Sequence, residues 1–129
     1  MLIKELRASK ILNSRNEETI EIYIDTGKGK AVSAAPSGKS RGIYEAEPFS
    51  SKGINTSIAF ANFIGSVLIS EKINLQTFDD LKKFEDILRK YDTTKNWSMI
   101  GGNTVFAMES ALLKAMAISE KKELWQFLN

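Results

Sequence analysis

Residues 17–36, "EETIEIYIDTGKGKAVSAAP", decide the fold class. Ile20, Ile22 and Ile24 alternate with polar or amphipathic side chains, so they fall on one face of an extended chain. A strand of this kind is typical of a sheet that packs one side on a core and leaves the other in water. The stretch therefore predicts a half-buried strand over residues 17–26.

The flanking segments extend this strand into a sheet. "GKGK" at residues 27–30 predicts a glycine-rich hairpin turn, and residues 31–36 predict a third strand that ends at Pro36. Upstream, residues 3–11 alternate weakly and predict a first strand. Three consecutive strands with short connections predict an antiparallel meander with one solvated face.

The second half of the chain has the periodicity of helices. Residues 55–70, 78–91 and 103–119 carry apolar side chains every three or four positions, and residues 123–128 predict a short last helix. The side chains that we expect on the apolar faces are Ile58, Ala61, Phe63, Ile64, Val67, Leu68, Phe78, Leu81, Phe84, Ile87, Leu88, Tyr91, Val105, Phe106, Met108, Leu112, Leu113 and Met116. Strands first and helices afterwards predict an α+β fold, with a three-stranded antiparallel meander followed by a bundle of three to four helices. We expect a single domain over residues 1–129.

Composition narrows the chemistry that the chain can perform. The 129 residues contain neither cysteine nor histidine, which excludes disulfides, thiolate chemistry and the commonest general acid–base group. The net charge is +2, with 18 basic and 16 acidic residues interspersed, so we expect no nucleic-acid partner. The longest apolar stretch is too short to cross a bilayer, and the N-terminus has no signal-peptide pattern. We therefore expect no membrane partner and a cytoplasmic location.

A polar loop follows the predicted sheet. Residues 36–46, "PSGKSRGIYEA", contain two glycines, two serines and two cations. Such a loop is suited to a phosphate or a metal ion, but it also suits a plain turn leaving a sheet. Composition alone leaves both interpretations open.

Three motifs together resemble a known family, the amino-terminal domain of enolase. Residues 13–19, "NSRNEET", stand where the family has D-S-R-G-N-P-T, followed by a strand of alternating apolar residues. Residues 34–42, "AAPSGKSRG", match A-x-P-S-G-A-S-T-G, and Glu-Ala follows in both. Residues 92–103, "DTTKNWSMIGGN", resemble D-G-T-x-N-K-S-x-x-G-A-N. The motifs occur in the family's order and at closely matching spacing, over nearly the whole chain.

The resemblance implies a capping domain and not a complete enzyme. Enolase, or phosphopyruvate hydratase, is a magnesium-dependent lyase of glycolysis that dehydrates 2-phosphoglycerate to phosphoenolpyruvate. Its catalytic lysine, acidic partner and principal magnesium carboxylates lie in a barrel domain after the cap. This sequence stops at Asn129, where that barrel would begin. We therefore expect a stand-alone chain without catalytic residues of its own, although the family is enzymatic.

The resemblance also assigns an expectation to the polar loop. In the family, the second serine of S-G-A-S-T-G coordinates a second magnesium ion when the loop closes over substrate, and the matching position is Ser40. We expect no magnesium site from Ser40 alone, and magnesium only together with a barrel partner. Lys39 and Arg41 replace alanine and threonine, which disfavours a dication and suits a small phosphorylated anion, unless both side chains point to solvent. The candidate anion-binding residues are Ser37, Gly38, Lys39, Ser40, Arg41 and Gly42.

Arg15 and Glu45 are candidate interface residues. Arg15 keeps the arginine of D-S-R, which in enolases lies near subunit and domain contacts; it either anchors a partner's carboxylate or forms a local salt bridge with Glu17 or Glu18. Glu45 follows the loop as in the family, where it would hold the loop by accepting hydrogen bonds. "DTTKN" at residues 92–96 has too few alternating acids for a calcium loop, so we expect a structural turn.

Three functions remain open at this stage. The chain is a binding or assembly module, or one subunit of a split enzyme whose barrel is a separate chain, or a fragment of a longer protein. Trp125, Phe127 and Leu128 lie close together near the end of the sequence. We expect them to pack back on the preceding helix; if exposed, they would favour self-association as a homo-oligomer. The partner would otherwise be an enolase-like barrel. Other large apolar residues that we assign to the core or an interface are Met99, Met108, Met116 and Trp97.

Overall fold

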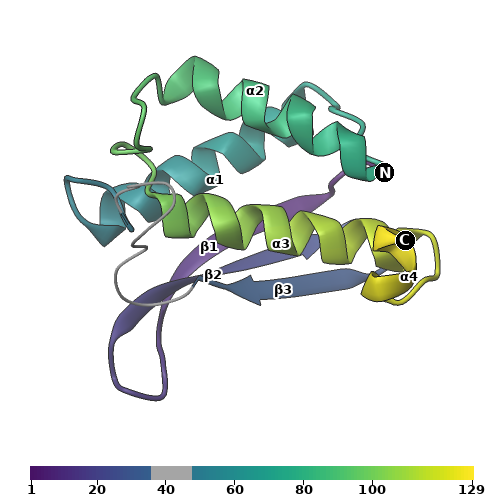
Figure 1. Cartoon of the computed structure of the whole chain (residues 1–129), viewed down its shortest axis with the longest axis horizontal. Coiled ribbons are helices and arrows are strands. Elements are labelled where there is room, and N and C mark those ends of the chain that lie inside the picture. Colours follow the sequence, from purple (N-terminus) through teal and green to yellow (C-terminus); the bar gives the residue numbers. More distant parts are fainter. Residues whose placement is uncertain (36–47) are drawn as a thin grey trace.

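The computed structural model describes residues 1–35 and 48–129, and in this part the α+β prediction is confirmed. Strands β1 (Glu5–Leu12), β2 (Glu18–Asp25) and β3 (Lys30–Ala34) form one antiparallel sheet in the order β1-β2-β3 (Figure 1). The stretch with alternating isoleucines is thus the central strand β2, and β3 is its hairpin partner. The β2 isoleucines Ile20, Ile22 and Ile24 are fully buried because helices pack on that face of the sheet.

The register of the sheet aligns one apolar face. Leu6 pairs with Ile24 and Ala8 pairs with Ile22, and all four side chains are buried. Ile20 is also fully buried, as the alternation predicts. Because side chains alternate between the faces of a strand, Glu5, Arg7, Glu21 and Asp25 fall on the opposite, solvated face. The ion pair of Lys10 and Glu18 lies at the exposed end of the apolar face.

The helices cover the apolar face of the sheet. They are α1 (Ile54–Ser70), the short 3-10 helix η1 (Phe78–Asp80), α2 (Leu81–Tyr91), α3 (Gly102–Ser119) and α4 (Leu124–Leu128). Helix α1 packs against β1, and α3 packs against β2 and β3. Figure 1 shows α2 above α1 and α3, on the side away from the sheet. Strands, α1, α2 and α3 contribute to one hydrophobic core.

Helix α1 lies close to β1 because of two residues. A Cβ atom on Gly65 would lie 2.9 Å from Leu6 Cδ2, so glycine permits this approach. The side-chain amide of Asn62 accepts a hydrogen bond from Ala8 N at 2.8 Å and donates one to Ala8 O at 3.1 Å. Asn62 thereby occupies both backbone groups at the middle of the outer edge of β1.

The prediction of a core position is wrong for two aromatic residues. Phe78 is 55% exposed because it lies in the 3-10 turn before α2, where the spacing of an α-helix does not apply. Phe106 is 58% exposed although it lies inside α3. Its neighbours Val105 and Met108 take the buried positions of that turn, and Phe106 lies on the solvent side between them.

Tyr91 and Phe63 are also exposed in part, and correct the same prediction. Their rings meet edge to face, with centroids 4.9 Å apart, so α1 and the end of α2 are also joined at the surface. Met99 is likewise exposed, whereas Met108 and Met116 lie in the core as predicted.

The end of the chain departs from the expected packing. Trp125 is 66% exposed and Leu128 is also exposed, so the prediction that they pack back on the preceding helix is wrong. Only Phe127 packs against the core. A five-residue helix has too few turns to bury two faces at once. Among residues 1–35 and 48–129, no helix is long and apolar enough to span a membrane.

Candidate functional site

Most of the predicted site residues fall in one segment. Ser37, Gly38, Lys39, Ser40, Arg41, Gly42 and Glu45 lie outside the described residues. The structure instead describes the two chain ends that flank this segment, at Ala35 and Pro48, and the residues that hold them. We call this set of residues, 19–20, 35, 48–51, 57, 92–94 and 98–103, the loop frame.

The first end of the loop frame is fixed by buried hydrogen bonds to β2. Ala35 N donates to Ile20 O at 2.7 Å, and Thr19 Oγ1 donates to Ala35 O at 2.7 Å. Thr19 and Ala35 are both buried. Buried hydrogen bonds with both groups of one peptide residue set the direction in which the chain leaves the sheet.

The second end is fixed by a close backbone contact. Asn103 N, in the first turn of α3, donates to Pro48 O at 2.9 Å. Gly101 precedes this helix with φ 93°, and a Cβ atom there would lie 2.4 Å from Phe49 Cα. Only glycine fits both the positive φ and the approach of residues 48 and 49. Gly101 therefore serves packing.

Two serines extend this second anchor to α1. Ser50 N donates to Ser57 Oγ at 2.7 Å inside the protein, and Ser51 N donates to Ser98 O at 2.8 Å. Both Ser50 and Ser57 are buried. The chain after residue 47 is therefore joined to α1 and to the loop before α3 within four residues.

Asp92 organises the loop between α2 and α3. It is fully buried, and its Oδ1 accepts hydrogen bonds from Thr94 N and Thr94 Oγ1. Its Oδ2 accepts from Met99 N at 3.1 Å and Ile100 N at 3.0 Å. Because both oxygens are used by the loop itself, the stretch "DTTKN" is a structural turn, as the sequence predicts.

Arg89 holds the outer side of the same loop. Its guanidinium carbon lies 3.5 Å from the ring centroid of Trp97, and its Nη1 donates to Thr94 O. Trp97 has φ 56° and packs against the core. A planar cation stacked on an indole stabilises this uncommon backbone conformation.

Arg15 does not form the local salt bridge that was one of its two expected roles. Glu18 pairs with Lys10 at 3.2 Å, and Glu17 accepts from the side-chain amide of Asn13 at 3.1 Å. Within residues 1–35 and 48–129, Arg15 forms no ion pair and its side chain is exposed. Its role at an interface stays a prediction.

The described residues do not fit a magnesium ion. In that part of the chain no three acidic residues come together in a way that could hold a metal, and Ser40 lies outside it. Two carboxylates do meet, Glu109 of α3 and Glu85 of α2. Burial, and after it the hydrogen bond and negative charge of Glu85, raise the pKa of Glu109 to about 7.

Sequence reasoning missed the residues that hold the loop frame. The Asp-x-Thr pattern at residues 92–94 is typical of side-chain turns and could have identified Asp92. Nothing in the sequence alone signals the Thr19–Ala35 hydrogen bond or the contact of Gly101 with Phe49, since each joins segments far apart in the chain.

Comparison with known proteins gives one family over nearly the whole chain. The model of the family "Enolase, N-terminal domain" matches residues 3–128. The chain is 37% identical over 127 residues to the enolase of Methanothermobacter thermautotrophicus, covering 98% of this chain and 30% of that protein. It is 35% identical to the enolase of Methanosphaera stadtmanae, again over 98% of this chain and 30% of the relative.

A more distant relative shows the same coverage. Enolase 1 of Entamoeba histolytica is 29% identical over 137 residues, covering 99% of this chain and 30% of that protein. The chain thus spans less than a third of the length of these curated relatives. Since the family model covers all but the first two residues and the last, the chain belongs to the family of enolase amino-terminal domains.

Proposed function

We propose that this chain acts as the capping domain of an enolase-type assembly, without turnover of its own, and that it works by docking on a partner. The observation that carries the proposal is the exposure of Met99, which is part of the loop frame, and of Phe106, which follows it. Met99 N is held by Asp92, and Phe106 lies one turn after Asn103, which binds Pro48. Large apolar side chains held out on an ordered frame are suited to burial against another protein surface.

The partner that fits this surface is an enolase-type barrel, supplied by another chain or by a longer form of this one, or a second copy of the domain. Exposed Trp125 and Leu128 on α4 support association as well, at another place on the surface. In keeping with the enolase relatives, we expect this encounter in the cytoplasm.

Association can be tested by sedimentation, first alone and then with a barrel-only enolase. We expect self-association at micromolar concentration or a complex with the barrel. Phe106→Ser should weaken the affinity of the dimer or of the barrel complex, whichever is observed, by at least tenfold, as expected for a central apolar contact. Phe78→Ser is the matched control, because Phe78 is also exposed but lies away from the frame. A strict monomer that ignores the barrel would overturn the docking proposal.

Split-enzyme function is the second candidate, and the names of the relatives favour it. Mixing the chain with a barrel-only enolase and magnesium should then restore phosphoenolpyruvate formation, followed by absorbance. Ser40→Ala should reduce the restored rate if Ser40 contributes to the metal site. The isolated chain should show no turnover; unaided hydration or dehydration of a phosphorylated three-carbon acid would overturn the non-catalytic assignment.

The preference of residues 37–42 for an anion has a separate test. Lys39 and Arg41 favour phosphate over magnesium on electrostatic grounds. We expect phosphate, sulfate or phosphoenolpyruvate at millimolar concentration to shift the backbone amide signals of residues 37–42. Unchanged amide signals would contradict an anion site.

A further inference from the structure

A groove of about 820 Å³ lies at the end of the molecule where both chain termini are found, away from the start of α3 and the loop frame (Figure 1). Five segments build it: the first four residues, the β2–β3 turn, the C-terminal ends of α1 and α3, and the connection before η1 at Gln76. It is lined by Met1, Leu2, Ile3, Lys4, Thr26, Lys28, Leu68, Ile69, Lys72, Gln76, Ser119 and Glu120. Nothing in the proposed capping function uses this groove.

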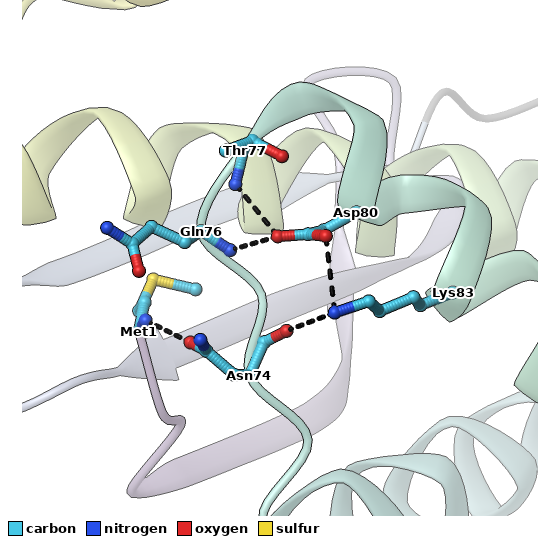
Figure 2. Close-up of polar contacts among 6 residues, drawn as sticks. All are labelled: Met1, Asn74, Gln76, Thr77, Asp80 and Lys83. Atoms are coloured by element: carbon cyan, nitrogen blue, oxygen red, sulfur yellow. Dashed lines mark hydrogen bonds and ion pairs between the residues drawn. The ribbon is translucent and has the colours of Figure 1, made fainter.

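One wall of the groove is fixed by a polar network. Leu75 N donates to Met1 O at 3.0 Å, and the amino group of Met1 donates to Asn74 Oδ1. Figure 2 shows Gln76 N donating to the carboxylate of Asp80, the last residue of η1, which directly precedes α2. The first residues are therefore held against the connection before α2, and the wall is part of the ordered fold.

The inside of the groove is mainly aliphatic. Leu68 is buried and Ile69 is half-buried, while Leu2 is 49% exposed beside them. Among the residues that the structure describes, no aromatic side chain lines the groove, so these residues offer no ring on which a nucleic-acid base could stack.

Three lysines line the groove and have no counter-charge. Lys4, Lys28 and Lys72 form no ion pair within the described parts of the chain. The one carboxylate of the lining, Glu120, is paired with Lys122 at 3.4 Å. Lys4 is held across the β2–β3 turn, where a Cβ atom on Gly27 would lie 2.7 Å from its Cε. The groove is therefore positively charged above an aliphatic floor.

Lys72 occupies a position that favours glycine. It follows α1 with φ 51°, and Ile73 N donates to Leu68 O at 3.1 Å, a bond that closes the helix end. A left-handed conformation costs a residue with a Cβ atom roughly 1 kcal/mol, which glycine avoids. Part of this cost is offset because a cation is favourable at a helix C-terminus.

We propose that this groove binds an acidic segment of a partner protein, a peptide that places aliphatic side chains on the floor and carboxylates against Lys4, Lys28 and Lys72. Charge complementarity selects an anionic occupant. The groove is open along one side and is not an enclosed cavity, which suits a peptide better than a small molecule that must be buried on most of its surface. A concave shape does not suit a membrane surface.

The test uses the whole chain and a defined probe. An acetylated and amidated pentapeptide, Glu-Leu-Asp-Leu-Glu, should shift the amide signals of residues 1–4, 26–28 and 68–72 in NMR titrations. Raising sodium chloride from 50 to 300 mM should weaken binding several-fold, because screening reduces the attraction of exposed charges. A peptide with lysines in place of the acidic residues should not bind.

Lys72→Gly separates binding from folding. It removes a cation of the groove and relieves the left-handed backbone, so binding should fall at least fivefold while the unfolding midpoint stays equal or rises. Lys121→Gly is the matched control: Lys121 follows α3 with φ 57° but does not line the groove. It should relieve the same strain and leave binding unchanged.

Three results would overturn the proposal. One is the absence of amide shifts with the acidic peptide at millimolar concentration. Another is equal binding by the Lys72→Gly and Lys121→Gly variants. The third is binding of decanoate or anionic vesicles without binding of the peptide, which would assign the groove to a different class of ligand.

Discussion

The two ends of this domain are held together by different kinds of contact. At the loop frame, Asp92, Thr19 and Ser57 are buried and make hydrogen bonds to backbone groups. At the groove end, Asp80 pairs with Lys83, and the amino group of Met1 donates to Asn74; both contacts lie near the surface (Figure 2). Buried polar contacts are costly to leave unpaired, whereas exposed ones are weak and can change partners. The frame is thus suited to holding one geometry, and the groove end to recognition.

The strongest test of this difference is Asp92→Ala. It would leave the N–H groups of Thr94, Met99 and Ile100 without their acceptor, at a cost of about 3–4 kcal/mol in the free energy of unfolding. Urea unfolding measures the loss. Asp86→Ala, which removes an exposed carboxylate paired only with Lys82, should cost less than about 0.5 kcal/mol. Similar losses for the two variants would show that the frame is no more firmly held than the surface.

Gly101→Ala tests the close contact in the frame. The variant must accept a positive φ and a clash with Phe49, so we expect a loss of about 2–3 kcal/mol. Gly53 provides the matched control, since it precedes α1 with φ 108° but has no atom within 4 Å of a Cβ position. Gly53→Ala should cost less than Gly101→Ala, about 1–2 kcal/mol, from backbone strain alone. Equal losses in thermal unfolding would rule out the clash.

The pair Glu85 and Glu109 lies between α2 and α3, away from the hydrogen bonds of the frame. Burial and Glu85 raise the pKa of Glu109 from 4.5 to about 7. The folded protein therefore holds this proton more tightly than the unfolded chain. The stabilisation is complete below pH 4.5 and is lost as the pH rises through 7. Because the side chain is only partly buried, we expect a loss of about 1–2 kcal/mol.

Glu109→Gln should remove this part of the pH dependence, measured as the unfolding midpoint between pH 5 and pH 8. Glu85→Gln should reduce it, since the like charge beside Glu109 is then absent. An unchanged pH profile in the Glu109→Gln variant would contradict the raised pKa of Glu109.

The smallest expected effect belongs to the groove end. Hydrogen bonds from Gln76 N and Thr77 N lower the pKa of Asp80 to about 2. Its stabilisation is present above the ordinary value of 3.8 and is lost as the pH falls through 2. Asp80→Ala should cost about 1 kcal/mol at pH 7, as for the loss of a helix cap. Asp79→Ala, one residue earlier and exposed, should leave the free energy of unfolding nearly unchanged. A loss larger than that of Asp80→Ala would contradict the capping role of Asp80.

The sequence predicts the sheet well because its signal is local. Ile20, Ile22 and Ile24 alternate within five residues, and the buried face of β2 follows directly from that alternation. The three main helices are found by their spacing for the same reason. Phe106 could not be placed, since its neighbour Val105 is apolar too and the spacing alone does not say which of them faces the core.

The site was harder to predict because its geometry is not local. Ser37 to Gly42 and Arg15 are motif positions, and a motif assigns residues without saying what they contact. The Thr19–Ala35 hydrogen bond depends on the register of the sheet, and the groove depends on five segments whose positions are set only by the folded core. The lysine at residue 72 carries no signal of its backbone conformation, since lysine is ordinary near the end of a helix.

Asn62 has a consequence for how copies of this domain can join. With its amide on both backbone groups of Ala8, the β1 side cannot accept a further strand without breaking two hydrogen bonds. Strand-to-strand joining is then easier at the β3 side, where one side-chain hydrogen bond, from Lys114 Nζ to Val32 O at 3.0 Å, would be displaced. A pair formed there would present a blocked β1 on each flank. Strand pairing would then stop at a dimer, because Asn62 disfavours the addition of a third molecule at β1.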